Sequence, residues 1–526
     1  MKKIYTVVAV LLVFCAVGKA QEITFSKDIA PIIYDNCTVC HRPNEIGPMS
    51  FTSYDEVRNW GPMIQYVTEI KYMPPWKPDP HYSRFLDERG LSEGEVAMIK
   101  QWVENGMPQG NLADEPPVPT FPEGSQIGEP DLVLSFAESY THKGNNRDQY
   151  QIFVLPTGLT EDRVIKSIEL RPGNRRIVHH ALFTMDATGQ ARQKDAATPE
   201  YGYPGFGGFG VPEQGSYPGY VPGSKARLLP ESMGLEIKAG SDLLIQMHYA
   251  PSPVDEVDST TVNIFFADEE EQVERFVEEA ILLPFFPFIQ NGPFVMQPES
   301  VKEFYCTFTT PIDVSLIAVA PHMHLLGKDW TVFAVDPQGD TTNIISIPDW
   351  DFNWQGAYFF PRLIPVKAGT TLHAYATYDN TSDNPFNPTF PPRRVSWGEG
   401  TEDEMFYLPF FYVPYQQGDE NIVFEELTTS SDDLDFDFPK NILSTPYPNP
   451  CSDKAMLEYQ LETRGNYTID VFDIQGRLVK QPMLGQYHST GTHQFVINTS
   501  GLENGTYLVR LSTQGMELSQ KLTVLK

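Results

Sequence analysis

The stretch that decides the fold runs from Val314 to Trp330 and reads V-S-L-I-A-V-A-P-H-M-H-L-L-G-K-D-W. Its apolar part, which ends at Ala320, predicts a buried strand. The strand leads into His322 and His324, and residues two apart in an extended chain point to the same face. Two imidazoles on one face form half of a metal site, so the remaining ligands must come from elsewhere in the chain.

Length, charge and the N-terminus set the compartment. At 526 residues the chain is too long for one hydrophobic core and suggests about three or four domains. Residues 1–20 combine Lys2-Lys3, an apolar run and small residues before Gln21, which is the pattern of a secretory signal peptide. No later run approaches the roughly 20 apolar residues of a membrane-spanning helix, so we expect an exported, soluble protein. The net charge of −31 excludes nucleic acid as a partner, because phosphate would be repelled.

The segment 21–113 has the apolar spacing of helices, which we expect near 29–34, 54–66 and 93–103. Ser92 and Glu95 predict a capping box at the start of the last helix. The segment also contains Cys37-Thr38-Val39-Cys40-His41, the C-x-x-C-H signature of covalent haem attachment with the histidine on the iron. A disulfide or half of a zinc site is the alternative, but no second C-x-x-C follows. The segment resembles a cytochrome c domain.

Met73, in the run Y-M-P-P-W, is the expected sixth iron ligand. A thioether followed by prolines resembles the methionine loop of small cytochromes c. The alternatives are Met49, Met63, Met107 and His81.

Residues 114–127 are rich in proline and predict a linker. From residue 128 onward, short alternating runs between turn residues predict strands, including 132–135, 150–155, 164–170, 177–185 and 243–249. His179-His180 lies on the fourth of these and His248 on the last. Adjacent side chains on a regular strand face opposite ways, so one metal can use both His179 and His180 only at a bulge or a strand edge. The run 199–225, rich in Gly, Pro and aromatic residues, predicts an ordered surface loop or cleft wall.

Four motifs, in order, carry a family resemblance. They are H-H-A-L-F (179–183), P-E-S-M-G-L-E-I with L-L-I-Q-M-H-Y (230–237 and 243–249), P-H-M-H-L-L-G-K (321–328) and W-G-E-G-T-E-D-E-M (397–405). Over roughly 128–419 they resemble the copper type II, ascorbate-dependent monooxygenases, which include peptidylglycine alpha-hydroxylating monooxygenase and dopamine beta-monooxygenase. The resemblance implies two jelly-roll-like β-sandwiches, 128–280 and 281–427, with one copper ion each. The implied ligands are His179, His180 and His248 for the first copper and His322, His324 and Met405 for the second.

The ligand types suit this chemistry. Imidazole binds copper in both oxidation states, and a thioether favours the reduced state. Three imidazoles therefore suit an electron-storage copper, and two imidazoles with Met405 suit a copper that stays reduced until dioxygen arrives. The alternatives are unrelated surface or core histidines, or one structural zinc site. His81, His142, His373, His488 and His493 have no partners in sequence and receive no assignment.

The substrate cannot be the family's glycine-extended peptide. The family's carboxylate-binding arginine corresponds to Ala320, and its Asn and Tyr after the ligand methionine correspond to Tyr407 and Pro409. Arg393 and Arg394 could bind an anion, although an arginine pair on a loop is usually solvated.

The C-terminal part begins with an acidic linker, 428–440. Residues 441–526 predict a small β-sandwich that starts with Y-P-N-P and resembles the sorting domain of type IX secretion substrates. An adhesive immunoglobulin-like module is the alternative.

The sequence thus predicts a multidomain, mainly β protein: a small all-α cytochrome c domain, two jelly-roll-like β-sandwich copper domains and a C-terminal small β-sandwich. The predicted function is an exported haem-copper monooxygenase at the cell surface or outside the cell, with two copper ions and one haem c. It would hydroxylate a C–H bond of a small organic substrate with dioxygen, and the haem would relay electrons from a donor protein or ascorbate. The alternatives are a non-enzymatic electron-transfer or copper-binding protein, and an enzyme whose haem is a sensor.

Overall fold

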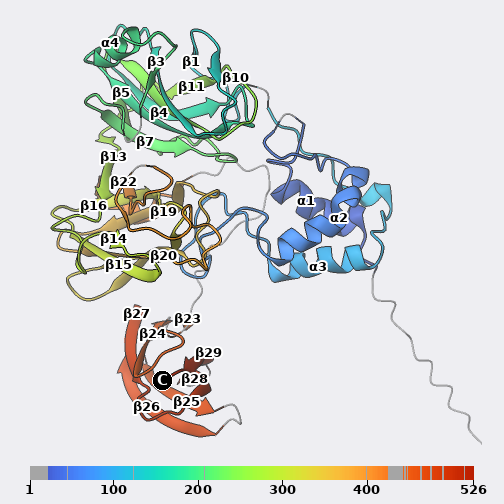
Figure 1. Cartoon of the computed structure of the whole chain (residues 1–526), viewed down its shortest axis with the longest axis vertical. Coiled ribbons are helices and arrows are strands. Elements are labelled where there is room, and N and C mark those ends of the chain that lie inside the picture. The colour runs from blue at the N-terminus through green and yellow to red at the C-terminus, as the bar shows by residue number, and fades with distance from the viewer. Residues whose placement is uncertain are drawn as a thin grey trace, which may run out of the picture. The chain divides into compact units, whose positions relative to one another are not determined.

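The computed structural model describes residues 22–43, 45–122, 124–205, 208–398, 400–424, 442–443, 446, 448–461, 465–473, 477–488, 491–513 and 516–526. The predicted signal peptide and acidic linker lie outside these residues. The described chain is mainly β (Figure 1). It forms two compact units. One unit holds the chain up to Pro75 together with Arg89–Thr120, and the other holds Trp76–Glu88 and Phe121–Lys526. Among the described residues, no helix has the length and apolar character to cross a bilayer.

The first unit is helical. Its elements are the π-helical turn η1 (Phe25–Ile29), α1 (Ala30–Asn36), α2 (Tyr54–Glu69), α3 (Glu93–Glu104) and the 3-10 turn η2 (Leu112–Asp114). The three predicted helices are confirmed. The predicted capping box is also present, because Ser92 accepts the Glu95 N–H and the Glu95 carboxylate accepts the Ser92 N–H. Buried Phe25, Ile99 and Trp102 pack the helices together.

The second unit opens with two five-stranded sheets packed on one core. The first sheet has the order β1 (Leu132–Ser135), β11 (Thr261–Phe266), β4 (Arg163–Arg171), β8 (Met233–Ile237) and β12 (Arg275–Phe276). The second has the order β6 (Tyr203–Pro204), β3 (Gln149–Pro156), β9 (Asp242–Tyr249), β5 (Val178–Asp186) and β7 (Gln214–Tyr220). The short pair β2 (Tyr140–His142) and β10 (Glu256–Asp258) and the helix α4 (Gln190–Ala196) complete this sandwich. All predicted strands of this region are present.

A second sandwich follows. One sheet has the order β13 (Glu278–Leu282), β22 (Leu408–Pro414), β16 (Val314–Val319) and β19 (Tyr358–Val366). The other has the order β15 (Ser300–Thr309), β20 (Thr371–Asn380), β17 (Gly327–Val335) and β18 (Thr341–Ile347), and β14 (Val295–Met296) pairs with β21 (Val395–Ser396).

Strand β16 connects the cores of the two sandwiches. All its residues are buried, as its apolar sequence predicts. Leu316 and Val319 belong to the core of the second sandwich, whereas Ile317 and Ala318 pack into the core of the first. A β-bulge between Leu316 and Ala318 interrupts the regular alternation of side chains. Both faces of the strand are nevertheless buried, so this sheet joins the two sandwiches.

The C-terminal residues form a smaller β domain around its own core. Its two sheets have the orders β23 (Ile442–Leu443), β24 (Lys454–Leu461), β27 (Gly491–Asn498) and β26 (Leu478–His488), β25 (Gly465–Asp473), β28 (Gly505–Thr513), β29 (Met516–Val524).

Two features differ from the sequence prediction. The run 199–225 is not only loop, because it supplies the edge strands β6 and β7, where proline and glycine are tolerated. The expected helical domain 21–113 is interrupted, because Trp76–Glu88 belongs to the β unit. Leu86 donates its N–H to the Phe359 carbonyl at 2.9 Å, and Asp87 pairs with Arg227 and Lys225.

Candidate metal centres

The first histidine cluster lies on the neighbouring strands β5 and β9. In their antiparallel register Val178 faces Tyr249 and His180 faces His248, so β5 has one residue more than β9 between these pairs. The extra residue, His179, forms a β-bulge, which lets adjacent side chains turn to one face. The bulge that a shared metal would require is therefore present.

The three imidazoles converge through their Nδ1 atoms. His180 Nδ1 lies 3.2 Å from His179 Nδ1 and 3.3 Å from His248 Nδ1. One ligand nitrogen from each residue lies within 4.8 Å of the other two. Nitrogens about 2.0 Å from one tetrahedral metal stand about 3.3 Å apart. The cluster thus has the spacing of a three-imidazole metal site.

Asp148, directly before β3, and Tyr150, on β3, orient His248. The His248 Nε2–H donates to Asp148 Oδ1 at 2.7 Å, which leaves the Nδ1 lone pair for the cluster. The Tyr150 ring stacks on the His248 ring with centroids 4.3 Å apart and an 8° interplanar angle. Burial raises the pKa of Asp148, but the hydrogen bond and charge of His248 outweigh it, so the pKa is below its usual value.

Burial keeps two histidines of this cluster, His179 and His180, neutral. Together with the neighbouring His248, it lowers the pKa of His179 to about 4 and that of His180 well below its usual value. Metal binding requires unprotonated imidazole. His179 and His180 are therefore in their ligand form at neutral pH.

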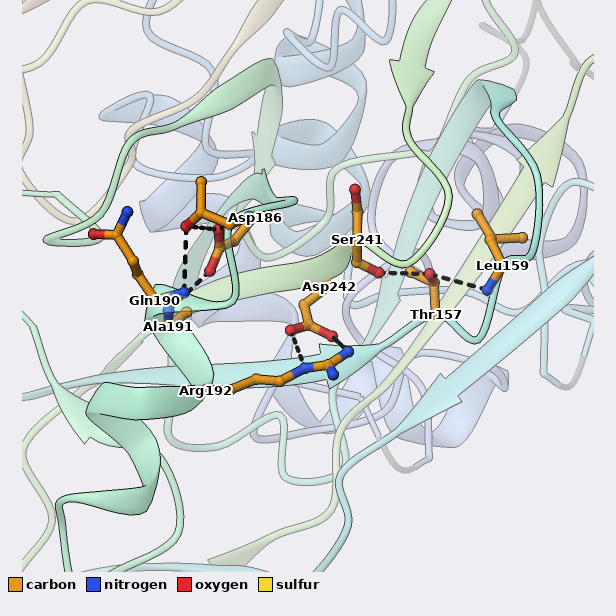
Figure 2. Close-up of polar contacts among 9 residues, drawn as sticks. Thr157, Leu159, Asp186, Gln190, Ala191, Arg192, Ser241 and Asp242 are labelled. Carbon is orange, nitrogen blue, oxygen red and sulfur yellow. Dashed lines mark hydrogen bonds and ion pairs between the residues drawn. The ribbon is translucent and has the colours of Figure 1, made fainter.

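A polar network fixes the opposite ends of the same two strands (Figure 2). Asp186, the last residue of β5, accepts the N–H groups of Thr188 and Ala191 at 2.7 and 2.8 Å. Arg192 of α4 donates from Nε and Nη2 to Asp242, the first residue of β9, at 2.5 and 2.6 Å. The fork ties α4 to the first residue of β9, and Asp186 ties the start of α4 to the last residue of β5.

The second cluster follows β16. The rings of His322 and His324 have centroids 5.0 Å apart and an 83° interplanar angle. His322 exchanges both backbone hydrogen bonds with Tyr407, at 2.8 and 3.1 Å. This bridge sets the segment that holds Met405 beside the segment that holds the two histidines.

Glu404 fixes the backbone of this cluster. The fully buried carboxylate accepts the N–H groups of His324, Leu326 and Met405 at 2.9, 2.6 and 3.1 Å. Burial raises the pKa of Glu404 to about 8, although these N–H groups act in the other direction. One side chain therefore ties the histidine segment to the methionine segment.

The Nδ1 atoms of the second cluster are occupied. His322 Nδ1 hydrogen-bonds Gln355 Oε1, and His324 Nδ1 lies 3.1 Å from the Asp403 carbonyl oxygen. Protons on both Nδ1 atoms leave the Nε2 atoms as the metal ligands. Burial, helped by His324, lowers the pKa of His322 to about 3, and burial also lowers that of His324.

The haem-attachment motif forms a helical turn after α1. The His41 N–H donates to the Cys37 carbonyl at 2.8 Å, and the thiols of Cys37 and Cys40 are both free. His41 Nδ1 lies 3.1 Å from the Met49 carbonyl oxygen, which leaves Nε2 available to iron. A Cβ at Gly47 would lie 2.6 Å from the Cys40 carbonyl oxygen and 2.7 Å from His41 Nδ1, so the loop over the histidine requires glycine.

Met73 follows α2, where its N–H donates to the Val67 carbonyl at 3.1 Å. The assignment of Met73 as sixth ligand remains a prediction. Three alternatives have other surroundings. The Met107 sulfur packs on Gly61 of α2, Met63 is 50% exposed, and His81 lies in the segment that belongs to the β unit. Met49 packs against the helical core.

Several residues of the metal centres escaped the sequence prediction. Asp148 and Gln355 contact their histidines over separations of 100 and 33 residues, and no local pattern marks such contacts. Glu404 had a weak signal, because an acidic residue directly precedes the predicted ligand Met405. The aromatic residue Phe352 also lies against both clusters and had no sequence signal.

One comparison with known proteins identifies part of the chain. Residues 445–525 match the family described as secretion system C-terminal sorting domain. The predicted sorting domain is confirmed, and it marks the protein for export by the type IX secretion machinery to the cell surface or the extracellular space. No curated protein matches the chain.

Solved structures give only weak similarity. The β-glucuronidase of Parabacteroides merdae is 11% identical over 42% of this chain and 28% of that one, with a TM-score of 0.14. PNGF-II is 11% identical over 55% of this chain and 64% of that one, with a TM-score of 0.20. The β-glucuronidase of Bacteroides uniformis is 11% identical over 45% and 29%, with a TM-score of 0.14. The chain spans less than two thirds of each structure, and these similarities carry no functional argument.

Proposed function

We propose that this exported protein is a haem-copper monooxygenase that hydroxylates a C–H bond of a small organic substrate. The observation that carries the proposal is the convergence of His179, His180 and His248 Nδ1 atoms at 3.2 and 3.3 Å. Three aligned nitrogens on a bulged strand pair, with His248 fixed by a carboxylate, are what a redox-active metal ion requires.

The residues present fit two copper ions. The first would be held by His179, His180 and His248, and the second by His322, His324 and the thioether of Met405. Bound copper supplies one-electron redox chemistry and, with dioxygen, the oxidising power for C–H hydroxylation. The two sandwiches of the β unit would be the jelly-roll-like domains 128–280 and 281–427.

The side chains around the clusters have defined tasks. Asp148 holds the proton on His248 Nε2 and so presents Nδ1 to the first cluster. In the second cluster, Gln355 and the Asp403 carbonyl hold the protons on the Nδ1 atoms of His322 and His324. Each imidazole would therefore present its Nε2 atom to the metal ion. The thioether of Met405 would favour a reduced metal, in keeping with a site that reacts with dioxygen.

The helical unit would be a cytochrome c domain that supplies electrons. Cys37 and Cys40 would attach the haem, His41 would bind the iron through Nε2, and Met73 would be the sixth ligand. Hydroxylation with dioxygen uses two electrons besides those of the substrate, and a haem carries one at a time. Two copper ions would store both electrons after two successive transfers from the haem.

The test begins with copper and haem analysis of the purified mature protein, followed by oxygen uptake against a panel of small organic compounds. We expect two copper ions, one haem, and substrate-dependent oxygen uptake. His324→Ala should abolish the uptake and leave the haem spectrum intact. His373→Ala is the matched control, because this histidine lies on β20 with its Nδ1 on the Tyr305 hydroxyl, 2.6 Å away.

The outcomes separate the candidate functions. Tight copper and haem binding without oxygen uptake would indicate an electron-transfer or copper-binding protein. Uptake that survives His324→Ala would refute the proposed dioxygen site. Cys37→Ala tests the relay, because a haem that only senses would leave copper reduction unchanged.

A further inference from the structure

Phe352 lies where the two histidine clusters meet. Its ring centroid is 6.3 Å from that of His179, 6.5 Å from that of His322 and 5.8 Å from that of His324. Aromatic rings at these separations are in contact range. One phenyl ring therefore touches the first cluster through His179 and the second through His322 and His324.

The segment between β18 and β19 fixes this ring. Trp350 is 7% exposed, and its backbone N–H donates to the Lys328 carbonyl at 2.8 Å. The Gln355 amide donates to the Phe352 carbonyl at 2.6 Å, while its oxygen binds His322 Nδ1. The same side chain thus positions a predicted metal ligand and the phenyl group. Phe352 is only partly buried, so part of its surface stays accessible beside the two clusters.

A second aromatic ring borders His322. The Tyr407 ring stands at 86° to the His322 ring with centroids 6.4 Å apart. Phe352 and Tyr407 therefore lie beside the same imidazole.

The geometry points to Phe352 as the residue that determines substrate size. It limits the space beside His322 and His324 to small organic molecules and excludes those that carry an additional aromatic ring. This inference rests on the proposed copper function, and its test reads binding rather than turnover.

The experiment uses the full mature chain loaded with Cu(II), with copper content measured first. Imidazole and 4-phenylimidazole are titrated separately, and their dissociation constants are read from the change in the Cu(II) electron paramagnetic resonance spectrum. We expect the wild-type protein to bind 4-phenylimidazole at least about tenfold more weakly than imidazole. A group that does not fit its site typically lowers binding or discrimination by about 10- to 200-fold. In Phe352→Ala the dissociation constants of imidazole and 4-phenylimidazole should differ by no more than about threefold, because the phenyl group of the larger probe can occupy the space that the Phe352 ring leaves.

Two further variants serve as an intermediate case and as a control. Phe352→Leu retains part of the side-chain volume and should give intermediate discrimination even if the alanine variant loads copper poorly. Phe386→Ala removes a phenyl group that is 60% exposed on the same sandwich, and it should behave as wild type.

Each outcome has a distinct meaning. Equal binding of both probes by copper-loaded wild type, or unchanged discrimination in both Phe352 variants, would overturn the role of Phe352 and leave the copper proposal standing. A wild-type protein that takes up no copper would overturn the proposed function and this inference with it.

Discussion

Removing the carboxylate of Asp148 should weaken copper binding at the first cluster alone. Asp148→Ala deletes the acceptor that holds the proton on His248 Nε2, so the imidazole loses its fixed tautomer and orientation. Loss of such an outer partner lowers metal affinity by about 10- to 100-fold, or about 1.4 to 2.7 kcal/mol. The Asp148 side chain is 30% exposed, so water partly replaces it. We therefore expect a loss near the lower limit, about tenfold.

The assay is competition for Cu(I) between the full chain and a chromogenic chelator, fitted to two sites. Asp148→Asn is the informative partner variant, because its amide oxygen still accepts the Nε2–H, and its loss should be about threefold or less. Asp255→Ala is the control, since this carboxylate is 61% exposed on the same sandwich and contacts Lys143 and the Gly144 N–H. The affinity of the second cluster should not change in any of them.

Two results would contradict this reasoning. If Asp148→Ala binds copper as tightly as wild type, the His248 orientation does not depend on the carboxylate. If the asparagine variant loses as much as the alanine variant, charge rather than orientation is what matters.

Three further predictions address other parts of the molecule. Met405→Ala should lower the affinity of the second cluster for Cu(I) about tenfold more than for Cu(II), because the soft thioether prefers the reduced ion; paired competition titrations in both oxidation states measure this. Asp87→Asn should lower the thermal unfolding midpoint at pH 7, and this loss should shrink as the pH falls below the usual pKa of an aspartate. Burial raises the pKa of the Asp87 carboxyl, but the basic partners of Asp87, Arg227 foremost, outweigh burial and lower this pKa. The ion pairs therefore stabilise the fold fully above the usual pKa of an aspartate, and this stabilisation is lost as the pH falls through the lowered pKa. Asp242→Asn should reduce the free energy of unfolding by about 1 to 2 kcal/mol, because Asp242 is buried while its partner Arg192 is 54% exposed and partly solvated. Urea unfolding followed by tryptophan fluorescence measures this loss. An unchanged unfolding midpoint would contradict the prediction.

Local sequence predicted the elements that carry the ligands. The apolar run from Val314 predicted β16, and the adjacent pair His179-His180 required the bulge that the register of β5 and β9 contains. Both predictions rest on side-chain alternation, which a strand imposes on neighbouring residues. The partners of the ligands were not predictable, because Asp148 and Gln355 reach their histidines only through tertiary packing.

The interruption of the helical unit shows a second limit. Phe85 and Leu86 are two apolar residues in a segment without helix or strand, and nothing in their neighbours shows which core buries them. Phe85 packs in the core of the second sandwich and Leu86 in that of the first. A short irregular segment has no periodicity, so its destination depends on the surface that it meets.

The burial of β16 on both faces explains how two clusters from different sandwiches share the Phe352 ring. A sheet that packs on two cores cannot slide relative to either without opening cavities, and each cavity costs several kcal/mol. Ile317 and Leu363 place their side chains in the first core, while Leu316 anchors the second. The separation of the clusters is therefore set by close packing rather than by loops, and a smaller side chain at Ile317 should alter it even though no histidine is changed.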